Sequence, residues 1–303
     1  MMTHENVIGV AEQLMPQAEC IGIGDSFLMC NPIEEHGPWY WHRDITPETK
    51  SPLEGLQQDF LANEANYIHF NIALYHDDVY WIVPGSHKRL NTDEENRQLS
   101  AVGHSYAHKQ QPQTERRHTP LPGSICAELQ PGDMVVNPLE MLHWGSKYGT
   151  KIRRTYHFGC RAFGGPSAYY QSWSLPRYIE YLSPEIQERF HKCAALNEIA
   201  LDNMEAALRG ILQKDEAAFK AALARWHPGE TGRFVAVIFL CKNAQMLNEG
   251  KNPSLESRFT PDEVATLWER FTPLDQALQL DGDELDHTQA FLIPAPSRYR
   301  LNE

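Results

Sequence analysis

Hydrophobic and polar residues alternate along several short stretches in the first half of the chain. In residues 67–75, YIHFNIALY, large apolar side chains occupy every second position, and residues 152–163, IRRTYHFGCRAF, alternate in the same way. Side chains of a strand point to opposite faces in turn, so this pattern predicts β-strands. We also predict strands at residues 20–30, at residues 79–89 with a closing Pro-Gly turn, and on both sides of the Pro-Gly turn in residues 128–138.

The pattern changes near residue 170, where helical segments replace the short strands. Between Pro184 and Pro228 the chain has one glycine and no further proline, and it is rich in Ala, Leu, Glu and Lys. This composition predicts helix. Further helices are predicted at residues 231–249 and 260–271, and the second of these opens with a Thr-Pro pair suited to a helix N-terminus.

These elements together predict an α+β fold in two parts. Short strands with frequent turns and no interleaved helices are typical of an antiparallel barrel or jelly roll. We therefore predict a barrel or jelly-roll core at residues 1–170, with an insertion near residues 87–118. Residues 171–303 are predicted to form a mainly helical C-terminal region that packs on the core as a layer.

Composition and charge narrow the range of partners. The chain has the composition of an ordinary soluble globular protein, with 42% hydrophobic and 22% charged residues. Its 27 basic and 40 acidic residues give a net charge of −13. A nucleic-acid binder needs a dense cationic face, so we expect no nucleic-acid partner. We see no cationic leader and no apolar run approaching ~18 residues, and we expect a cytoplasmic protein without a membrane partner.

Two histidines and one aspartate have the spacing of metal ligands. His42 and Asp44, in WHRD, are two residues apart, so their side chains point to the same side of an extended backbone. His143 follows the hairpin predicted at residues 128–138. Two imidazoles and one carboxylate on one face of a barrel form the facial triad of non-haem iron oxygenases, and donors of this kind without thiolate suit Fe(II). We predict that these three residues bind the metal and form the catalytic centre.

Two adjacent arginines, Arg153 and Arg154, follow His143 on the next predicted strand. A guanidinium binds a carboxylate through two parallel hydrogen bonds, so an arginine here would anchor the distal carboxylate of a dicarboxylic co-substrate whose keto-acid end chelates the iron. Neighbouring strand residues point to opposite faces, and only one of the two arginines can enter the barrel.

Several motifs in this order resemble the phytanoyl-CoA dioxygenase family of Fe(II)/2-oxoglutarate oxygenases. The resemblance rests on WHRD, on YIHFNIALYHDDVYWIVPGSHKR, on the PGD turn and on HWGS followed by an arginine, and it covers roughly residues 20–165. It implies a double-stranded β-helix, or jelly roll, and iron ligation by His42, Asp44 and His143. The usual interval from the distal histidine implies Arg154, rather than Arg153, as the residue that binds 2-oxoglutarate.

The chain departs from the family pattern at two places. Family members typically have a much longer segment before the HxD motif, so either the C-terminal helices or the second subunit of a homodimer supplies the missing support, or the chain is a shortened relative. Asn71 stands where the family commonly has an aromatic residue near 2-oxoglutarate. For Asn71 we weigh a contact with the co-substrate against an ordinary hydrogen bond in the core.

We therefore predict an Fe(II)/2-oxoglutarate-dependent dioxygenase that uses dioxygen to hydroxylate an unactivated carbon of a small-molecule substrate. Asp44 favours hydroxylation or desaturation, because a small residue replaces this carboxylate in halogenating relatives. One alternative is a cupin-like metal-dependent enzyme that does not use 2-oxoglutarate, and another is a non-catalytic jelly-roll scaffold. For residues 87–118, which include His104 and His108, a surface loop is preferred to a lid over an anionic substrate.

Overall fold

The computed structural model describes residues 2–30, 41–44, 65–95, 119–145, 153–164, 173–226 and 233–279. The chain divides into two compact units. The first unit comprises Met1–Leu14, Ile23–Pro52 and Tyr67–Arg161, and the second comprises Met15–Gly22, Leu53–Asn66 and Ala162–Glu303. The first unit contains a short helix, α1 (Glu5–Leu14), and most of the strand residues.

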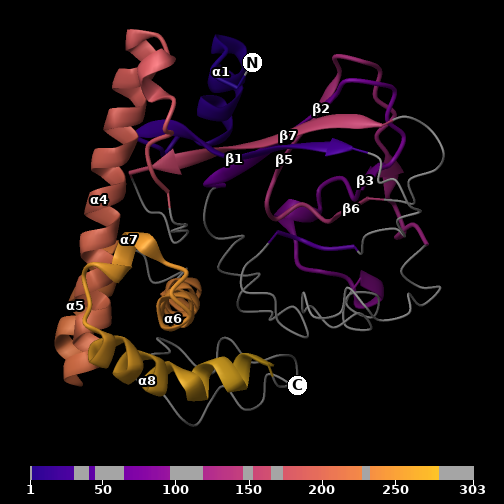
Figure 1. Ribbon diagram of the computed structural model, residues 1–303. Coiled ribbons are helices and arrows are strands. Elements are labelled where there is room, and N and C mark those ends of the chain that lie inside the picture. The colour runs from indigo at the N-terminus through magenta and orange to yellow at the C-terminus, as the bar shows by residue number, and fades with distance from the viewer. Residues whose placement is uncertain are drawn as a thin grey trace. The chain divides into compact units, whose positions relative to one another are not determined.

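The strands of the described residues form two sheets (Figure 1). The four-stranded sheet has the order β1-β7-β2-β5, and the three-stranded sheet has the order β4-β3-β6. All pairings in which the register is defined are antiparallel. The strands are β1 (Cys20–Cys30), β2 (Tyr67–Ala73), β3 (Tyr80–Ile82), β4 (Ile125–Cys126), β5 (Met134–Pro138), β6 (His143–Gly145) and β7 (Arg154–Phe163).

Strand β2 lies between β5 and β7, which explains why nearly all of its residues are buried. On one face, Phe70 stacks on Phe158 of β7 with the ring centroids 4.9 Å apart. On the other face, Tyr67 crosses β7 at Gly159, where an added Cβ atom would lie only 2.0 Å from the tyrosine oxygen. Glycine is therefore required at this point of β7, and the two faces of β2 carry different chemistry.

A small aromatic core supports the three-stranded sheet. Its buried members come from four segments that are far apart in the sequence, and the rings of Trp41 and Trp144 lie 5.4 Å apart. The Pro-Gly turn after β3 has Gly85 at a φ of 77°, which a residue with a side chain adopts at a cost. This turn leads into the short 3-10 helix η1 (Ser86–Lys88). The core residues are Trp41, Val83, Leu121, Leu142 and Trp144, with Trp81 packed against them.

The second unit is mainly helical. Figure 1 shows α8 running across the C-terminal end of the long helix α4. Within this unit α4 and α5 pack closely, because Gly210 of α4 approaches the backbone of Phe219 in α5: an added Cβ atom would lie 2.7 Å from the Phe219 nitrogen. The helices are α4 (Pro184–Gln213), α5 (Glu216–Trp226), α6 (Arg233–Asn248), α7 (Pro253–Glu256) and α8 (Pro261–Gln279), preceded by the 3-10 turn η4 (Ile179–Tyr181).

Helix α8 begins where the sequence predicts. Thr260 and Glu263 form a reciprocal cap, in which each backbone amide donates to the other residue's side chain at 3.3 and 2.8 Å. The helix then continues through Pro273 to Gln279, beyond the predicted end at residue 271. Propensity alone did not indicate this extension, because a proline inside a helix normally ends it.

The mixture of antiparallel sheets and helices confirms the predicted mixed α and β content. Two predicted strands are shorter than expected. Residues 79–89 contribute only β3, and the first half of the 128–138 hairpin contributes a single bridge between Leu129 and Asp77. Closure of the sheets into a jelly roll, the division near residue 170 and the packing of the helices as a layer stay predictions.

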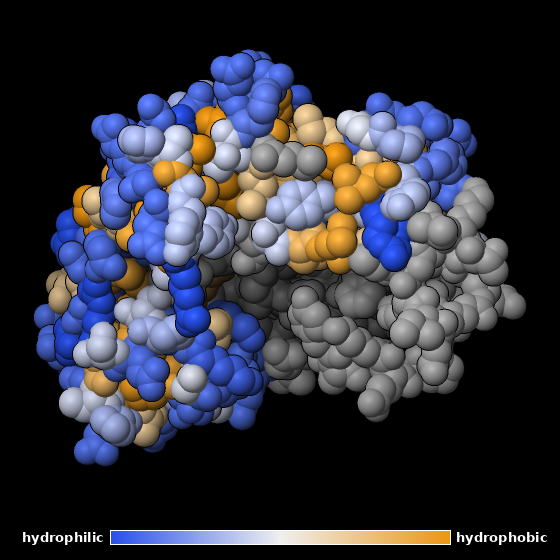
Figure 2. All heavy atoms as spheres, turned by 45° about the horizontal axis from the view of Figure 1, so that its top comes forward, coloured by the Kyte–Doolittle hydropathy of each residue, from blue (hydrophilic) through white to orange (hydrophobic). Residues whose placement is uncertain are grey.

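Hydrophilic side chains cover much of the face drawn in Figure 2, with apolar residues interspersed among them. This surface agrees with the ordinary globular composition of the chain. In the described part of the chain, no helix combines the length and the apolar character needed to cross a membrane.

Candidate metal centre

Backbone hydrogen bonds bring the two halves of the HxD…H motif together. The amide of His42 donates to the carbonyl of His143 at 3.1 Å, and the amide of His143 donates back at 3.0 Å. Asp44 adds a third bond from its amide to the carbonyl of Leu139 at 2.9 Å. Trp41 and Trp144, next to the two histidines in the chain, point into the aromatic core. Alternation therefore directs both imidazoles and the carboxylate away from that core.

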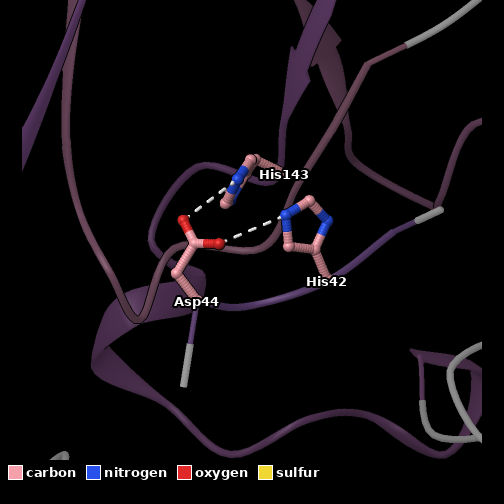
Figure 3. Close-up of side chains that lie close together, drawn as sticks. All are labelled: His42, Asp44 and His143. Atoms are coloured by element: carbon pink, nitrogen blue, oxygen red, sulfur yellow. Dashed lines mark ion pairs between the residues drawn. The ribbon is translucent and has the colours of Figure 1, made fainter. Parts of the chain in front are cut away.

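The three side chains converge on one another (Figure 3). His42 Nε2 lies 3.3 Å from Asp44 Oδ1, and His143 Nε2 lies 3.3 Å from Asp44 Oδ2. One donor atom from each residue can be chosen so that all three lie within 4.8 Å of one another. Among the described residues this is the group of three or more His, Cys, Asp and Glu side chains that is spaced to hold one metal ion.

The surroundings set the protonation states that a metal requires. Burial alone would raise the pKa of Asp44, but the neighbouring imidazoles of His143, His42 and His69 hold it well below its ordinary value. Burial, aided by His42, lowers the pKa of His143 to about 4 although Asp44 opposes this change. At neutral pH the site therefore contains an ionised carboxylate and a neutral imidazole at position 143.

A backbone contact also fixes which nitrogen of His143 is available. Its Nδ1 lies 2.9 Å from the carbonyl oxygen of Met141, and a carbonyl only accepts hydrogen bonds, so Nδ1 carries the proton. The lone pair is left on Nε2, the atom that faces Asp44. This is the usual arrangement of a metal-binding histidine, whose second nitrogen is held by a backbone or carboxylate oxygen.

A fourth residue, His69 of β2, also reaches the carboxylate. Its Nδ1 lies 3.2 Å from Asp44 Oδ2, close enough for an ion pair but without the alignment of a good hydrogen bond. His69 in turn contacts His157 of β7, with ring centroids 4.8 Å apart. The sequence places His69 on the same strand face as Asn71, but it gives no indication that this face meets Asp44.

Beyond His69 the wall of the site is polar and largely buried. His157 Nδ1 donates to Asn71 Oδ1 at 2.5 Å, while the buried amide nitrogen of Asn71 has no hydrogen-bond partner in the described residues. Burial and the neighbouring His69 lower the pKa of His157 to about 3, so this ring is neutral. On the other side, Tyr80 donates to Asn137 Oδ1 at 2.9 Å, and its ring centroid lies 5.6 Å from that of His143.

Arg153, and not Arg154 as expected, lies on the strand face that carries the site. Arg153, immediately before β7, is buried and lies on the same face as Thr155 and as His157, whose ring contacts His69. Arg154 lies on the other face, with Tyr156 and the core residue Phe158. Strand alternation thus places Arg153, rather than Arg154, on the site face, and the predicted binding of 2-oxoglutarate by Arg154 stays a prediction.

Arg153 already has an acidic partner inside the protein. Its Nε donates to Asp77 Oδ2 at 2.9 Å, and Thr155 donates to the same oxygen at 2.7 Å. The other oxygen of Asp77 accepts the amide of Val79 at 3.0 Å. Asp77 is 1% exposed, so this is a buried ion pair with additional hydrogen bonds.

Other predicted features fall outside the described residues. His104, His108 and most of the 87–118 insertion belong to residues 96–118, which the structure does not describe. The sequence did not single out His157 as a site residue, and it did not predict the contact of His69 with Asp44. Strand alternation in RTYHF contained the signal for His157, because it pairs with Asn71 across β2 and β7.

No family model matches this sequence, and no curated protein matches it. Several solved structures are similar to parts of the chain. The non-heme α-ketoglutarate-dependent epimerase SnoN from nogalamycin biosynthesis is 14% identical with a TM-score of 0.34, over 53% of this chain and 54% of that chain. EctD from S. alaskensis with 2-oxoglutarate and 5-hydroxyectoine is 14% identical with a TM-score of 0.35, over 54% of this chain and 51% of that chain.

AviO1 from Streptomyces viridochromogenes Tue57 is 17% identical with a TM-score of 0.34, over 55% of this chain and 61% of that chain. The matched region thus spans between half and three fifths of these proteins. The TM-scores are below 0.5, so the function proposed for this chain rests on the geometry of the three candidate ligands.

Proposed function

We propose that the protein is a non-haem Fe(II)- and 2-oxoglutarate-dependent oxygenase that hydroxylates an unactivated carbon of a small-molecule substrate. The observation that carries this proposal is the convergence of His42, Asp44 and His143, whose donor atoms lie within 4.8 Å of one another. Two nitrogens and one oxygen, without thiolate, form the donor set of the non-haem iron facial triad.

The spacing of the donors fits a single metal ion. Donors about 2.1 Å from a common ion and at right angles to one another would be about 3 Å apart. Each imidazole lies 3.3 Å from a different oxygen of Asp44, and one donor atom from each residue can be chosen so that all three lie within 4.8 Å, so side-chain adjustments would complete the site. Three protein ligands leave further coordination positions open for a chelating co-substrate and dioxygen.

The polar wall supports binding of a keto acid beside the metal. The amide nitrogen of Asn71 is buried and has no partner among the residues that the structure describes, and a buried donor of this kind is stabilised by an acceptor oxygen. Arg153 lies on the same face of β7 as His157 and carries the positive charge that a distal carboxylate would need. We therefore assign the co-substrate anchor to Arg153 and retain Asn71 as a co-substrate contact.

Each residue at the proposed metal site has a defined part in this mechanism. His42 and His143 would hold the metal through neutral imidazole nitrogens, and the Asp44 carboxylate would balance part of its charge. Burial raises the pKa of Tyr80, and nearby Asp44 raises it further, so its phenol stays protonated and keeps its hydrogen bond to Asn137. When bound, Fe(II) with 2-oxoglutarate and dioxygen supplies the oxidation, with release of succinate and carbon dioxide.

The finer classification belongs to the same proposal. We assign the core to a double-stranded β-helix of the phytanoyl-CoA dioxygenase type, a jelly roll in which the two sheets close around the site. The order of WHRD, the PGSHKR turn and HWGS supports this assignment, together with the antiparallel pairing of both sheets.

Anaerobic reconstitution with Fe(II) and 2-oxoglutarate tests the proposal. We expect a charge-transfer absorption when both are present, and release of succinate once air and a substrate from a metabolite library are added. Asp44→Ala should abolish both signals. Succinate release at the parental rate in Asp44→Ala would falsify the assignment of the ligands.

A second candidate function is a metal-dependent oxygenase or isomerase that does not use 2-oxoglutarate. The ion pair between Arg153 and Asp77 favours it, because the guanidinium is already charge-balanced within the protein. Metal binding that is lost in Asp44→Ala, without any spectroscopic or stabilising response to 2-oxoglutarate, would select this candidate.

A further inference from the structure

We propose that Arg43, the residue between His42 and Asp44, is a positioning residue. Its side chain fixes the two metal-binding segments relative to each other through contacts on the side opposite the metal ligands. This inference rests on the proposed metal site and adds to it a residue that touches neither metal nor co-substrate. The segments are residues 41–44, which carry His42 and Asp44, and residues 139–143, which end at His143.

Alternation places Arg43 on the reverse side of the site. His42 and Asp44 point toward one another and toward His143, so the side chain between them leaves the opposite side of the extended backbone. On that side Arg43 meets the turn before His143 and the PGSHKR turn that follows β3.

The guanidinium of Arg43 joins three segments through hydrogen bonds. One terminal nitrogen donates to the carbonyl of Ser86 at 2.8 Å and also to the carbonyl of Glu140. The other terminal nitrogen and Nε donate to the same oxygen of Asn91, at 2.7 and 3.0 Å. A planar fork with five N–H donors can make this set of contacts, whereas a lysine ammonium provides donors from one point only.

These contacts require the Arg43 guanidinium to lose part of its hydration, which a fully exposed arginine keeps. The Arg43 side chain is partly buried. The groups that accept its hydrogen bonds are backbone carbonyls and a side-chain amide rather than carboxylates. A partly buried cation whose hydrogen bonds go to neutral acceptors points to a geometric role, because these bonds provide no charge pairing.

Ser86 also links the two metal-binding segments, because it contacts both Leu142 and Arg43. Its Oγ accepts the amide of Leu142 at 2.9 Å, and its carbonyl accepts Arg43. Ser86 is 0% exposed. The residue immediately before His143 is therefore tied to the PGSHKR turn, and that turn is tied to the residue between His42 and Asp44. Loss of Arg43 would leave the three backbone bonds of the site but free the 139–143 turn to shift.

The test uses the full chain, freed of metal, with Co(II) as the probe. We measure the Co(II) dissociation constant and the ligand-field absorption of bound Co(II) by titration, together with the thermal unfolding of the metal-free protein. Arg43→Lys should raise the dissociation constant by about tenfold or more, the range seen when residues supporting metal ligands are changed. It should also alter the absorption spectrum, which reports the arrangement of the donors.

Arg209→Lys is the matched control. Arg209 also joins separate segments, donating to Glu205, Glu263 and the carbonyl of Arg258 within the helical unit. The same substitution there should lower the unfolding temperature without changing the Co(II) spectrum or affinity. An equal loss of affinity in Arg209→Lys would show that general destabilisation explains the result, and the positioning role would be overturned.

Asn91 provides a second pair of variants should Arg43→Lys fail to fold. Asn91→Ala removes the acceptor of two Arg43 hydrogen bonds and should weaken Co(II) binding, whereas Asn91→Asp keeps an acceptor oxygen and should restore it. Parental affinity and spectrum in folded Arg43→Lys or in Asn91→Ala would overturn the proposal.

The parent protein separates this proposal from the function on which it rests. Failure of the parent to bind Co(II), or equal binding after Asp44→Ala, overturns the metal site and the positioning role together. Binding that depends on Asp44 but is unaffected in Arg43→Lys overturns the positioning role alone.

Discussion

His42 and His143 face each other across an antiparallel bridge in which each backbone amide donates to the other residue's carbonyl, at 3.1 and 3.0 Å. Their imidazole rings, with centroids 4.2 Å apart, are thus brought together by main-chain bonds that do not depend on either side chain. The geometry of the site is expected to survive the loss of a ligand.

We therefore expect His42→Gln to lose metal binding while the metal-free protein keeps its fold. The backbone bridge remains in this variant, and only one of the three donors is removed. Circular dichroism and thermal unfolding of the metal-free protein check the fold, and Co(II) titration checks the site. His76→Gln, at an exposed position, serves as the control and should bind Co(II) like the parent. Unfolding of metal-free His42→Gln would contradict the expectation.

The two neighbouring arginines should respond very differently to substitution. Arg153→Met leaves Asp77 buried without its cation, and breaking a buried pair in this way typically costs about 3–5 kcal/mol. Arg154→Met removes a partly exposed side chain and should cost much less. Urea unfolding measures both. The milder Arg153→Lys should raise the requirement for 2-oxoglutarate more than Arg154→Lys, and the reverse order would return the anchor to Arg154.

Metal-free protein should lose stability as the pH falls below about 6.5, in part because of His157. Burial and His69 lower the folded-state pKa of His157 from its ordinary 6.5 to about 3, so the unfolded chain binds the proton more readily between these values. The free energy of unfolding should decrease by about 1–2 kcal/mol from this residue between pH 6.5 and 5. His157→Gln should make the decline shallower, whereas His191→Gln, on the exposed face of α4, should leave it unchanged.

Glu140 should have the opposite pH dependence. Burial raises its pKa from 4.5 to about 7 although Arg43 opposes this shift, so the folded protein holds this proton more tightly than the unfolded chain. Stability is therefore lost as the pH rises from 4.5 through 7. We expect Glu140→Gln to be more stable than the parent by about 2–3 kcal/mol at pH 8 and nearly equal to it at pH 4.5. Glu128→Gln, at an exposed position, should show no such difference.

Two glycines in helices should give opposite results when changed to alanine. Gly9→Ala in α1 meets nothing within 4 Å and should stabilise the protein by up to about 1 kcal/mol through helix propensity. Gly210→Ala in α4 would place a Cβ atom 2.7 Å from the nitrogen of Phe219 and should destabilise the helical unit by about 1–3 kcal/mol. Thermal unfolding distinguishes them, and a stabilised Gly210→Ala would mean that α4 and α5 pack less closely.

The alternation of residues predicted the elements that surround the site. β7 matches its predicted range closely, because a period of two is visible where one face of a strand differs from the other, and β1 matches the mostly apolar run at residues 20–30. The three candidate ligands could also be predicted, since an HxD pair fixes its own geometry on an extended backbone.

The orientation of the arginines could not be predicted from spacing. A shift of one residue reverses the face on which every side chain of a strand lies, and the register of β7 is set by its pairing with β2. Arg43 gave no signal of its own, because it appears only as the variable residue of the HxD motif. Its partners, Ser86 and Glu140, become neighbours only through the fold.

The aromatic core behind the site makes the protein its own optical probe. Trp41 precedes His42, Trp144 follows His143, and their indole rings lie 5.4 Å apart in the cluster that also contains Leu142. The chain has seven tryptophans, and the part of the intrinsic fluorescence that comes from Trp41 and Trp144 reports when the two distant parts of the chain meet during refolding. Quenching by a bound paramagnetic ion can only follow that moment, so one emission signal separates assembly of the site from its occupation.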